Sequence, residues 1–362
     1  MLSNLFRDFF RRKRQSGATE NALEAAVLSA KTLLGSNQFQ QVIDLLAPVL
    51  RQNPGHPEAL FMRGTAALEL ERQPEAMADL ERAVEMSPRE PRYLFNLALA
   101  HWINGNTART IDLCRKAISI AGFHPAHLLL ANIELYGEDY FAILARLHAQ
   151  LKPRTYLEVG VFRGSSLRRV PPETLAIGID PKPLLDQPPG PNQRVFAETS
   201  DDYFDKHDVV QEFGGHRIDM AFIDGMHQFE YALRDFINIE RLAGPGCVVL
   251  VHDCYPLDAQ TAMRERGTAF WSGDIWRLIL LLQKYRPDLA VHTIATPPTG
   301  LGMIFNLDPS SRVLAERQDD IVAEYLATDY SVLDGRKPEL LNYCPNDWPA
   351  IAALLDSRTR SH

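Results

Sequence analysis

A 34-residue period in the first third of the chain constrains the fold more than any other feature of the sequence. Pro57, Pro91 and Pro125 recur at this interval. Gly64 and Ala98 stand at equivalent points between them, where two helices must approach closely. A period of this length predicts stacked helical hairpins, each of which buries its apolar face only against its neighbours.

This pattern resembles the tetratricopeptide repeat, and the unit over residues 57–90 matches it best. A weaker unit covers 23–56 and a partial unit begins at Pro125, so we assign the repeats to residues 23–138. The resemblance implies a concave surface that binds a protein or peptide partner. A spacer or a dimerisation element is the alternative, and the sequence leaves both open.

A second motif lies in Tyr156-Leu-Glu-Val-Gly-Val-Phe-Arg-Gly-Ser-Ser166. It predicts a short buried strand, a turn with Gly160 and Gly164, and the start of a helix. Glycine lets the backbone approach a nucleotide-like ligand closely. The next apolar run ends in Asp180, whose carboxylate suits a pair of ribose hydroxyls. The glycine spacing differs from the dinucleotide fingerprint G-x-G-x-x-G.

Short apolar runs alternate with helical stretches from Thr155 onward, which predicts an α/β sheet covered on both faces. The five candidate strands are Thr155–Val159, Leu175–Ile179, Arg194–Ala197, Met220–Ile223 and Cys247–Val251. Two later runs, Ala290–Ala295 and Gly302–Asn306, flank a Pro-Pro-Thr-Gly linker and predict an antiparallel hairpin at the sheet edge. The C-terminal extension, 309–362, is expected to be helical over 311–327 and irregular over 330–348.

The E-x-G-x-x-x-G spacing of Glu158, Gly160 and Gly164 resembles motif I of class I S-adenosylmethionine (SAM) methyltransferases, and five parallel strands with a late hairpin resemble their fold. We therefore expect a Rossmann-like α/β methyltransferase domain over residues 139–308, preceded by the all-α repeat domain. The resemblance implies that the motif I residues hold the amino-acid portion of SAM and that Asp180 binds its ribose. The remaining implied cofactor contacts are Asp224 and, after the third strand, Glu198 and Thr199, which would face the adenine. For Glu158, a helix cap or an ion pair is the alternative role.

The segment Phe222-Ile-Asp-Gly-Met-His-Gln-Phe resembles a stretch of a methyltransferase group that acts on small molecules, including sugar and catechol-type O-methyltransferases. The fifth strand ends in His252-Asp253, as in that group, where carboxylates at these two strand ends bind Mg²⁺ in several members. Asp224 and Asp253 are thus candidate Mg²⁺ ligands, because a hard cation prefers oxygen and lowers the pKa of a bound hydroxyl.

Direct base catalysis is the alternative to a metal. His227 or His252 could remove a proton from a substrate hydroxyl, since histidine titrates near neutral pH. The candidate catalytic residues are therefore Asp224, His227 and His252. Trp271, Asp274 and Trp276 form a further cluster, which either lies near the acceptor pocket or packs in the core.

Together these motifs predict a SAM-dependent methyltransferase that modifies an oxygen of a small molecule, sugar or glycan. A repeat scaffold with a degenerate, non-catalytic SAM-binding domain is the first alternative, and the retained acids argue against it. A dehydrogenase is the second, and the glycine spacing and the terminal hairpin argue against it.

The net charge, the apolar runs and the cysteines of the chain limit what the protein can bind and where it is expected to be found. A net charge of −8 argues against binding nucleic acid through a basic surface. No apolar run is long enough to span a bilayer, and four cysteines without a C-x-x-C pair are typical of reduced thiols in a cytoplasmic protein. Residues 1–22 form a basic segment. Within it, residues 1–14 combine apolar and basic side chains, which predicts either peripheral membrane contact or a frayed helix.

Overall fold

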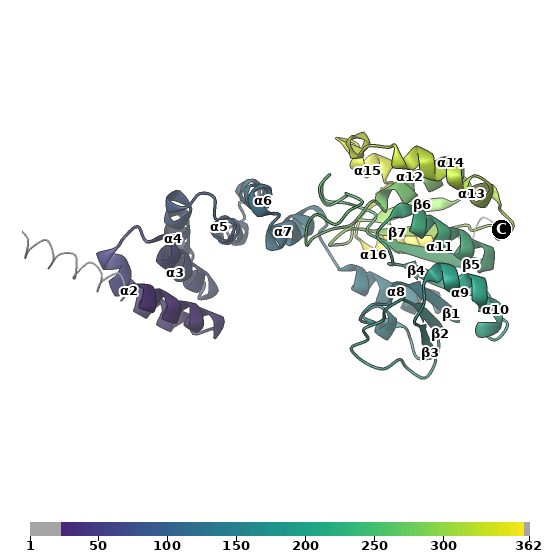
Figure 1. Ribbon diagram of the computed structural model, residues 1–362, viewed down its shortest axis with the longest axis horizontal. Helices are drawn as coiled ribbons and strands as arrows, with labels where there is room; N and C mark the ends of the chain where they lie inside the picture. The colour runs from purple at the N-terminus through teal and green to yellow at the C-terminus, as the bar shows by residue number, and fades with distance from the viewer. Residues whose placement is uncertain (1–22, 358–362) are drawn as a thin grey trace, which may run out of the picture. The chain divides into compact units, whose positions relative to one another are not determined.

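The computed structural model describes residues 23–357, and its chain divides into two compact units, Met1–Leu129 and Leu130–His362 (Figure 1). The basic segment 1–22, including the proposed membrane contact of residues 1–14, lies outside the described residues. Within the described range, no helix combines the length and apolar character needed to cross a membrane.

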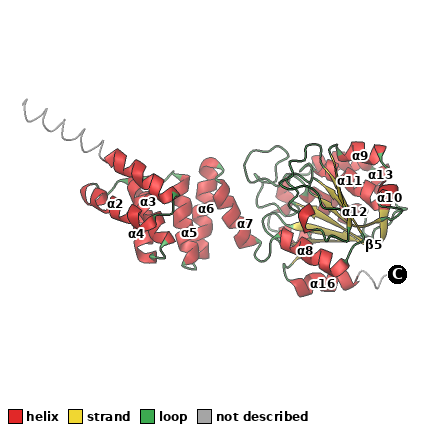
Figure 2. Cartoon of the chain, turned by 90° about the horizontal axis from the view of Figure 1, so that it is seen from below, coloured by secondary structure: helices red, strands yellow, loops and turns green. Residues whose placement is uncertain are grey.

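The first unit consists of helical hairpins, and Figure 2 shows strands only in the second unit. Its helices are residues 23–35, α2 (Phe39–Gln52), α3 (Pro57–Glu69), α4 (Gln73–Met86), α5 (Pro91–Ile103), α6 (Thr107–Ala121) and the first part of α7 (His124–Glu134). Helices α3 and α5 each begin at the periodic proline, whose fixed φ suits a first helical position. The predicted hairpin array is therefore confirmed.

Close helix packing explains the small residues of the period. A Cβ at Gly64 would lie 2.9 Å from Cγ of Leu80, so α3 and α4 approach with no room for a side chain there.

Successive repeats are joined by side chains about one period apart. The Arg92 guanidinium donates to the Glu58 carboxylate at 3.1 and 3.2 Å, and the Tyr93 hydroxyl donates to it at 2.5 Å.

The second unit is built on one eight-stranded sheet with the order β3-β2-β1-β4-β5-β7-β6-β8. The strands are β1 (Thr155–Val159), β2 (Leu175–Ile179), β3 (Gln193–Phe196), β4 (Ile218–Ile223), β5 (Ala243–His252), β6 (Ala290–Ile294), β7 (Leu301–Phe305) and β8 (Tyr343–Cys344). Strands β1 to β5 pair in parallel, and β7 pairs antiparallel with both β5 and β6. This confirms the Rossmann-like fold with a terminal hairpin.

Helices cover both faces of the sheet. One core packs α11 (Phe229–Leu242), α12 (Trp276–Tyr285) and α14 (Gln318–Leu326) against inward-facing strand residues. The opposite core contains residues of α8 (Tyr140–Leu151) and α16 (Trp348–Ser357). The shorter helices are α9 (Ser200–Lys206), α10 (Val209–Glu212), α13 (Val313–Glu316) and α15 (Lys337–Leu340). Burial on both faces explains why the strands read as continuous apolar runs.

Two details of the prediction are wrong. The turn after β1 leads to a single 3₁₀ turn, η1 (Leu167–Arg169), rather than to a helix, because Val170 precedes Pro171-Pro172 and a residue before proline disfavours helical backbone. The hairpin is not the edge of the sheet either, since β8 pairs in parallel with β6 beyond it.

Candidate active site at the carboxyl ends of the strands

The loops that follow β1 and β4 touch each other at the carboxyl edge of the sheet. The Asp224 backbone N–H donates to the Val159 carbonyl at 2.8 Å. Gly160 adopts a φ of +91°, and a Cβ there would lie 2.1 Å from the Asp224 carbonyl oxygen. Gly160 is therefore required by the packing of these two loops, before any ligand is considered.

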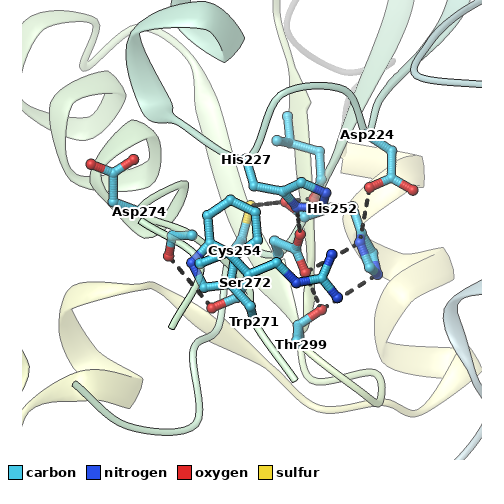
Figure 3. Close-up of polar contacts among 12 residues, drawn as sticks. Asp224, His227, His252, Cys254, Trp271, Ser272, Asp274 and Thr299 are labelled. Atoms are coloured by element: carbon cyan, nitrogen blue, oxygen red, sulfur yellow. Dashed lines mark hydrogen bonds and ion pairs between the residues drawn. The ribbon is translucent and has the colours of Figure 1, made fainter. Parts of the chain in front are cut away.

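Four polar side chains converge where β4 and β5 end (Figure 3). Nδ1 of His227 makes a close contact with Oδ2 of Asp253. The Thr299 hydroxyl donates to Oδ1 of Asp253 at 2.5 Å, from the loop between β6 and β7. Nδ1 of His252 lies 3.1 Å from Oδ1 of Asp224 and 3.3 Å from Oδ1 of Asp253. The structure thus brings together Asp224, His227, His252 and Asp253, all of which the sequence proposes as site residues.

The two histidines differ in their surroundings. Burial works to lower the pKa of His252, but the carboxylates of Asp224 and Asp253 offset this effect and hold it well above its usual value. Burial also opposes the charged form of His227, whose pKa is nevertheless raised through its contact with Asp253. For Asp253, burial acts to raise the pKa, and the neighbouring His252 and His227 hold it below its usual range. The two carboxylates therefore favour the protonated form of His252.

The same residues offer donors for a metal ion. Within the described part of the chain, Asp224, His227 and Asp253 each present a ligand atom within 4.8 Å of the other two. Two carboxylates and one imidazole suit a divalent cation such as Mn²⁺, while Mg²⁺ prefers an all-oxygen set. The donor set therefore fits a cation, although the charge of His252 opposes its binding.

The loop after β1 is fastened to the acid that ends β2. The Phe162 backbone N–H donates to Oδ2 of Asp180 at 2.8 Å, and the Lys182 N–H donates to Oδ1 at 2.7 Å. Gly164 has a φ of +72° and lies where this loop turns back. Because each carboxylate oxygen can accept a further hydrogen bond and Asp180 is half-buried, the group is available to a ribose.

Glu158 is completely buried beneath this loop. Its carboxyl group accepts hydrogen bonds from the Tyr156 hydroxyl at 2.8 Å and from the Ser166 hydroxyl at 2.5 Å. Burial raises the pKa of Glu158 to about 8, against the opposing effect of these two hydrogen bonds. Glu158 thus anchors both ends of the motif through neutral hydroxyl groups, and its contact with a cofactor stays a prediction.

Glu198 and Thr199, proposed as adenine contacts, follow β3 and have local partners. Oε1 of Glu198 lies 2.8 Å from Nε2 of His207. The Thr199 hydroxyl accepts from the Asp202 backbone N–H at 3.1 Å and so caps the first turn of α9. Their side chains order the segment after β3, and adenine binding stays a prediction for both.

The aromatic cluster divides between its two proposed roles. Trp276 is buried in the core, whereas the Trp271 ring lies 5.1 Å from the His227 ring. Asp274 is fully buried and accepts from the Phe229 backbone N–H at 2.9 Å and from Arg264 at 2.8 Å. Asp274 thereby fastens the segment after β5 to the loop that carries His227.

Thr299 is one site residue that the sequence reasoning missed. It follows the cis Pro297-Pro298 peptide bond in the hairpin linker, which the sequence predicts only as a tight reversal. The presence of a hydroxyl residue in that linker is the one local signal for it, and a threonine in a turn is too common to identify a site.

Comparison with known proteins agrees with this architecture. Residues 157–254 match the model of a methyltransferase domain family, and residues 27–88 and 74–125 match a tetratricopeptide repeat family. A comparison with curated proteins found no match.

Several solved structures are similar to parts of the chain. MamA from Desulfovibrio magneticus RS-1 is 22% identical, covers 36% of this chain and 83% of its own, and has a TM-score of 0.29. Cofactor-bound Rv0187 from MTB is 18% identical over 52% of this chain and 92% of its own, with a TM-score of 0.36. The O-methyltransferase TomG from Streptomyces achromogenes, in complex with SAM, is 19% identical. It covers 54% of this chain and 95% of its own, with a TM-score of 0.36. By its family matches, the chain carries a methyltransferase domain preceded by tetratricopeptide repeats.

Proposed function

We propose that the protein methylates an oxygen atom of a small molecule, sugar or glycan, with His227 as the general base. SAM supplies a methyl group on a positively charged sulfur, and the acceptor hydroxyl must lose its proton to attack it. The contact of His227 with the buried Asp253 carboxylate carries this proposal. A histidine oriented by a carboxylate is the arrangement that enzymes use to take a proton from a hydroxyl group.

The surroundings of the two histidines favour His227 over His252 as the base. Asp253 occupies Nδ1 of His227 and leaves Nε2 for the acceptor. The side chain of His227 is 34% exposed, against 11% for His252. His252 lies 3.1 Å from Asp224 and 3.3 Å from Asp253, whose carboxylates favour its protonated form, and in this proposal it balances their charge and does not accept a proton.

Asp180 and the Gly160–Gly164 turn are the residues that would hold SAM. Asp180 would accept the ribose hydroxyls with its carboxylate, which is already fixed by two backbone N–H groups. Asp224 would face the reacting end, since its backbone is held against Gly160. In this arrangement Asp224 links the cofactor side of the site to His252.

A divalent cation is the second way to activate the acceptor, and the donor set of Asp224, His227 and Asp253 favours it. Mg²⁺ or Mn²⁺ bound there would hold the acceptor hydroxyl and lower its pKa. Asp224 and Asp253, the two metal ligands predicted from the sequence, both belong to this donor set. The two mechanisms differ in their response to a chelator.

Calorimetric titration tests the cofactor. We expect the full-length protein to bind SAM and S-adenosylhomocysteine but not NAD. Asp180→Ala should weaken both by at least about tenfold, because hydrogen bonds to a charged group contribute about 1.5–3 kcal/mol each. The control is Asp186→Ala, which removes an exposed carboxylate paired with Arg163 near the same loop. Binding of NAD alone would contradict the methyltransferase assignment.

Transfer of a labelled methyl group to a panel of phenols, vicinal diols and sugars tests the chemistry. We expect transfer to persist in EDTA and to fall about 10²- to 10⁴-fold in His227→Gln, the range for loss of a general base. Loss in EDTA with recovery in Mg²⁺ or Mn²⁺ would instead support the metal. If S-adenosylhomocysteine binds and no acceptor in the panel reacts, the non-catalytic scaffold becomes the better description.

The repeats are expected to bind a protein partner. Trp102 and Ile103, at the end of α5, are 39% and 51% exposed and would supply apolar contacts for it. Chemical cross-linking of the full-length protein and of Trp102→Ala in cells tests this, because a partner bound there should be lost from the variant.

A further inference from the structure

Tyr140 reaches the active site from outside the residues that the methyltransferase family covers. It is the first residue of α8, and its ring lies 4.2 Å from the His252 ring between centroids. Its pKa is raised by burial and by the nearby Asp224, Asp253 and Glu158 carboxyl groups. Tyr140 therefore packs directly on the imidazole that lies between the two site aspartates.

The residues just before Tyr140 are fastened to loops of the second unit by side chains that donate to backbone oxygens. The Thr296 hydroxyl donates to the Glu138 carbonyl at 2.7 Å, and Nδ2 of Asn346 donates to the same carbonyl at 2.8 Å. Gly137 has a φ of +114°, and a Cβ there would lie 2.7 Å from Nδ2 of Asn346. The backbone conformation favours glycine, and a side chain there would displace the Asn346 amide that bonds the Glu138 carbonyl.

Nζ of Lys337 adds a further tie at the end of α7. It lies 3.2 Å from the Glu134 carboxylate and donates to the Pro256 carbonyl at 3.0 Å and to the Leu257 carbonyl at 3.3 Å. Glu134 is thereby linked to the segment that follows Asp253 along the chain. Residues 134–140, which we call the junction segment, are thus linked to both sides of Asp253: Tyr140 contacts His252, and Lys337 bridges Glu134 to Pro256 and Leu257.

The loop between β6 and β7 connects the junction segment to Asp253. The Gly300 N–H donates to the Thr296 carbonyl at 2.8 Å, which closes the loop into a compact turn. Thr299, in the same turn, accepts from the Tyr255 N–H through its carbonyl at 2.7 Å and donates to Asp253 through its hydroxyl. Any shift of Thr296 is therefore passed to the hydrogen bond that orients Asp253.

We propose that the junction segment is a positioning part of the active site. The Glu138 carbonyl, acting through Thr296 and Thr299, and the Tyr140 ring, acting through His252, both hold Asp253 in the orientation that serves His227. The inference rests on the proposed His227–Asp253 pair. Neither Glu138 nor Tyr140 touches the acceptor in this role, so each acts through another residue.

The experiment measures how fast the ring N–H proton of His227 exchanges with water. A junction segment that only stabilised the fold would leave this exchange rate unchanged. In full-length protein with ¹⁵N-labelled histidine, the resonance is identified by its loss in His227→Gln, and its exchange with water is measured. We expect exchange about threefold to tenfold faster in Thr296→Val, the range for loss of one hydrogen bond. A similar increase is expected in Tyr140→Leu, because the lost ring contact with His252 is an aromatic pair of comparable energy. Tyr140→Phe keeps the ring and should match the wild type.

Thr293→Val is the matched control on the same hairpin. Thr293 is as buried as Thr296, but its hydroxyl has no hydrogen-bond partner within residues 23–357, so its removal should leave the His227 exchange rate unchanged. Affinity for S-adenosylhomocysteine reports folding, and it should stay constant in every variant because Asp180 and Gly160 are untouched.

Unchanged exchange in both Thr296→Val and Tyr140→Leu would overturn the inference, as would rapid exchange in the wild type. If Tyr140→Leu does not fold, Thr296→Val decides the question alone. Failure of the wild-type protein to bind S-adenosylhomocysteine would refute the proposed function separately, since the exchange rate is measured without cofactor or acceptor.

Discussion

Gly160→Ala tests whether this glycine is required by the fold or by a ligand. The new Cβ would lie 2.1 Å from the Asp224 carbonyl oxygen, 2.4 Å from its carbon and 2.6 Å from the Gly225 nitrogen. All three atoms belong to the backbone of the loop after β4, so no side-chain rotation relieves the contact. Any accommodation must move the loop that carries Asp224 and His227.

The expected destabilisation has two parts. A residue with a side chain at a φ of +91° costs about 1–3 kcal/mol, and overpacking against fixed atoms costs about 1–3 kcal/mol more. The midpoint of the sum is about 4 kcal/mol. In a domain of this size 1 kcal/mol shifts Tm by about 2–4 °C, so the expected fall in Tm is about 8–16 °C.

Differential scanning calorimetry of the full-length protein measures this change. The transition of the methyltransferase domain is the one that S-adenosylhomocysteine shifts upward. Gly267→Ala is the control, because a Cβ at Gly267 has no atom within 4 Å and its φ is ordinary. A Gly160→Ala protein with wild-type Tm and lost S-adenosylhomocysteine binding would refute the reasoning, since it would place the need for glycine in the ligand.

Two further predictions concern buried charge. The pKa of Glu158 is raised to about 8 by burial, so its contribution to stability is present at low pH and is lost as pH rises toward 8. The Tm of the wild type should therefore fall relative to Glu158→Gln between about pH 5 and pH 8, and parallel curves would contradict this. Glu240→Ala removes the buried one of the two carboxylates that pair with Arg286, which is itself 2% exposed, and leaves only the exposed Asp288, so it should cost about 3 kcal/mol in thermal unfolding. The exposed pair Lys284–Glu324 gives the control, and Glu324→Ala should cost less than about 1 kcal/mol.

Features encoded by neighbouring residues could be predicted from the sequence. The strands are continuous apolar runs, and Asp180, Asp224 and Asp253 each follow one directly, so the order of the runs was enough to place them at one edge of the sheet. The repeat period is equally direct, because Pro57 and Pro91 each begin the first helix of a hairpin. The prediction of a helix after Gly164 is wrong, because it rests on the glycines and does not consider the prolines at 171 and 172.

Contacts between distant segments could not be predicted in this way. Thr299 meets Asp253 because β7 pairs antiparallel with β5, with His252 opposite Leu301, and this register places the preceding turn over the end of β5. Thr296 and Glu138 are 158 positions apart, and no local pattern in either segment indicates the other. The choice between His227 and His252 depended on burial and on neighbouring carboxylates, which are properties of the folded chain.

The ties of the junction segment limit how this gene can be recombined. The family match to the methyltransferase domain begins at residue 157, which suggests a breakpoint near β1 for exchanging the repeats. A breakpoint there would bring in a foreign residue at Tyr140 and a foreign loop in place of Gly137, whose backbone conformation fits against Asn346. Exchange upstream of Glu134 would preserve every one of these contacts. The part of the chain that must be kept together with the methyltransferase domain is thus longer than the recognisable domain, and it begins at the end of α7.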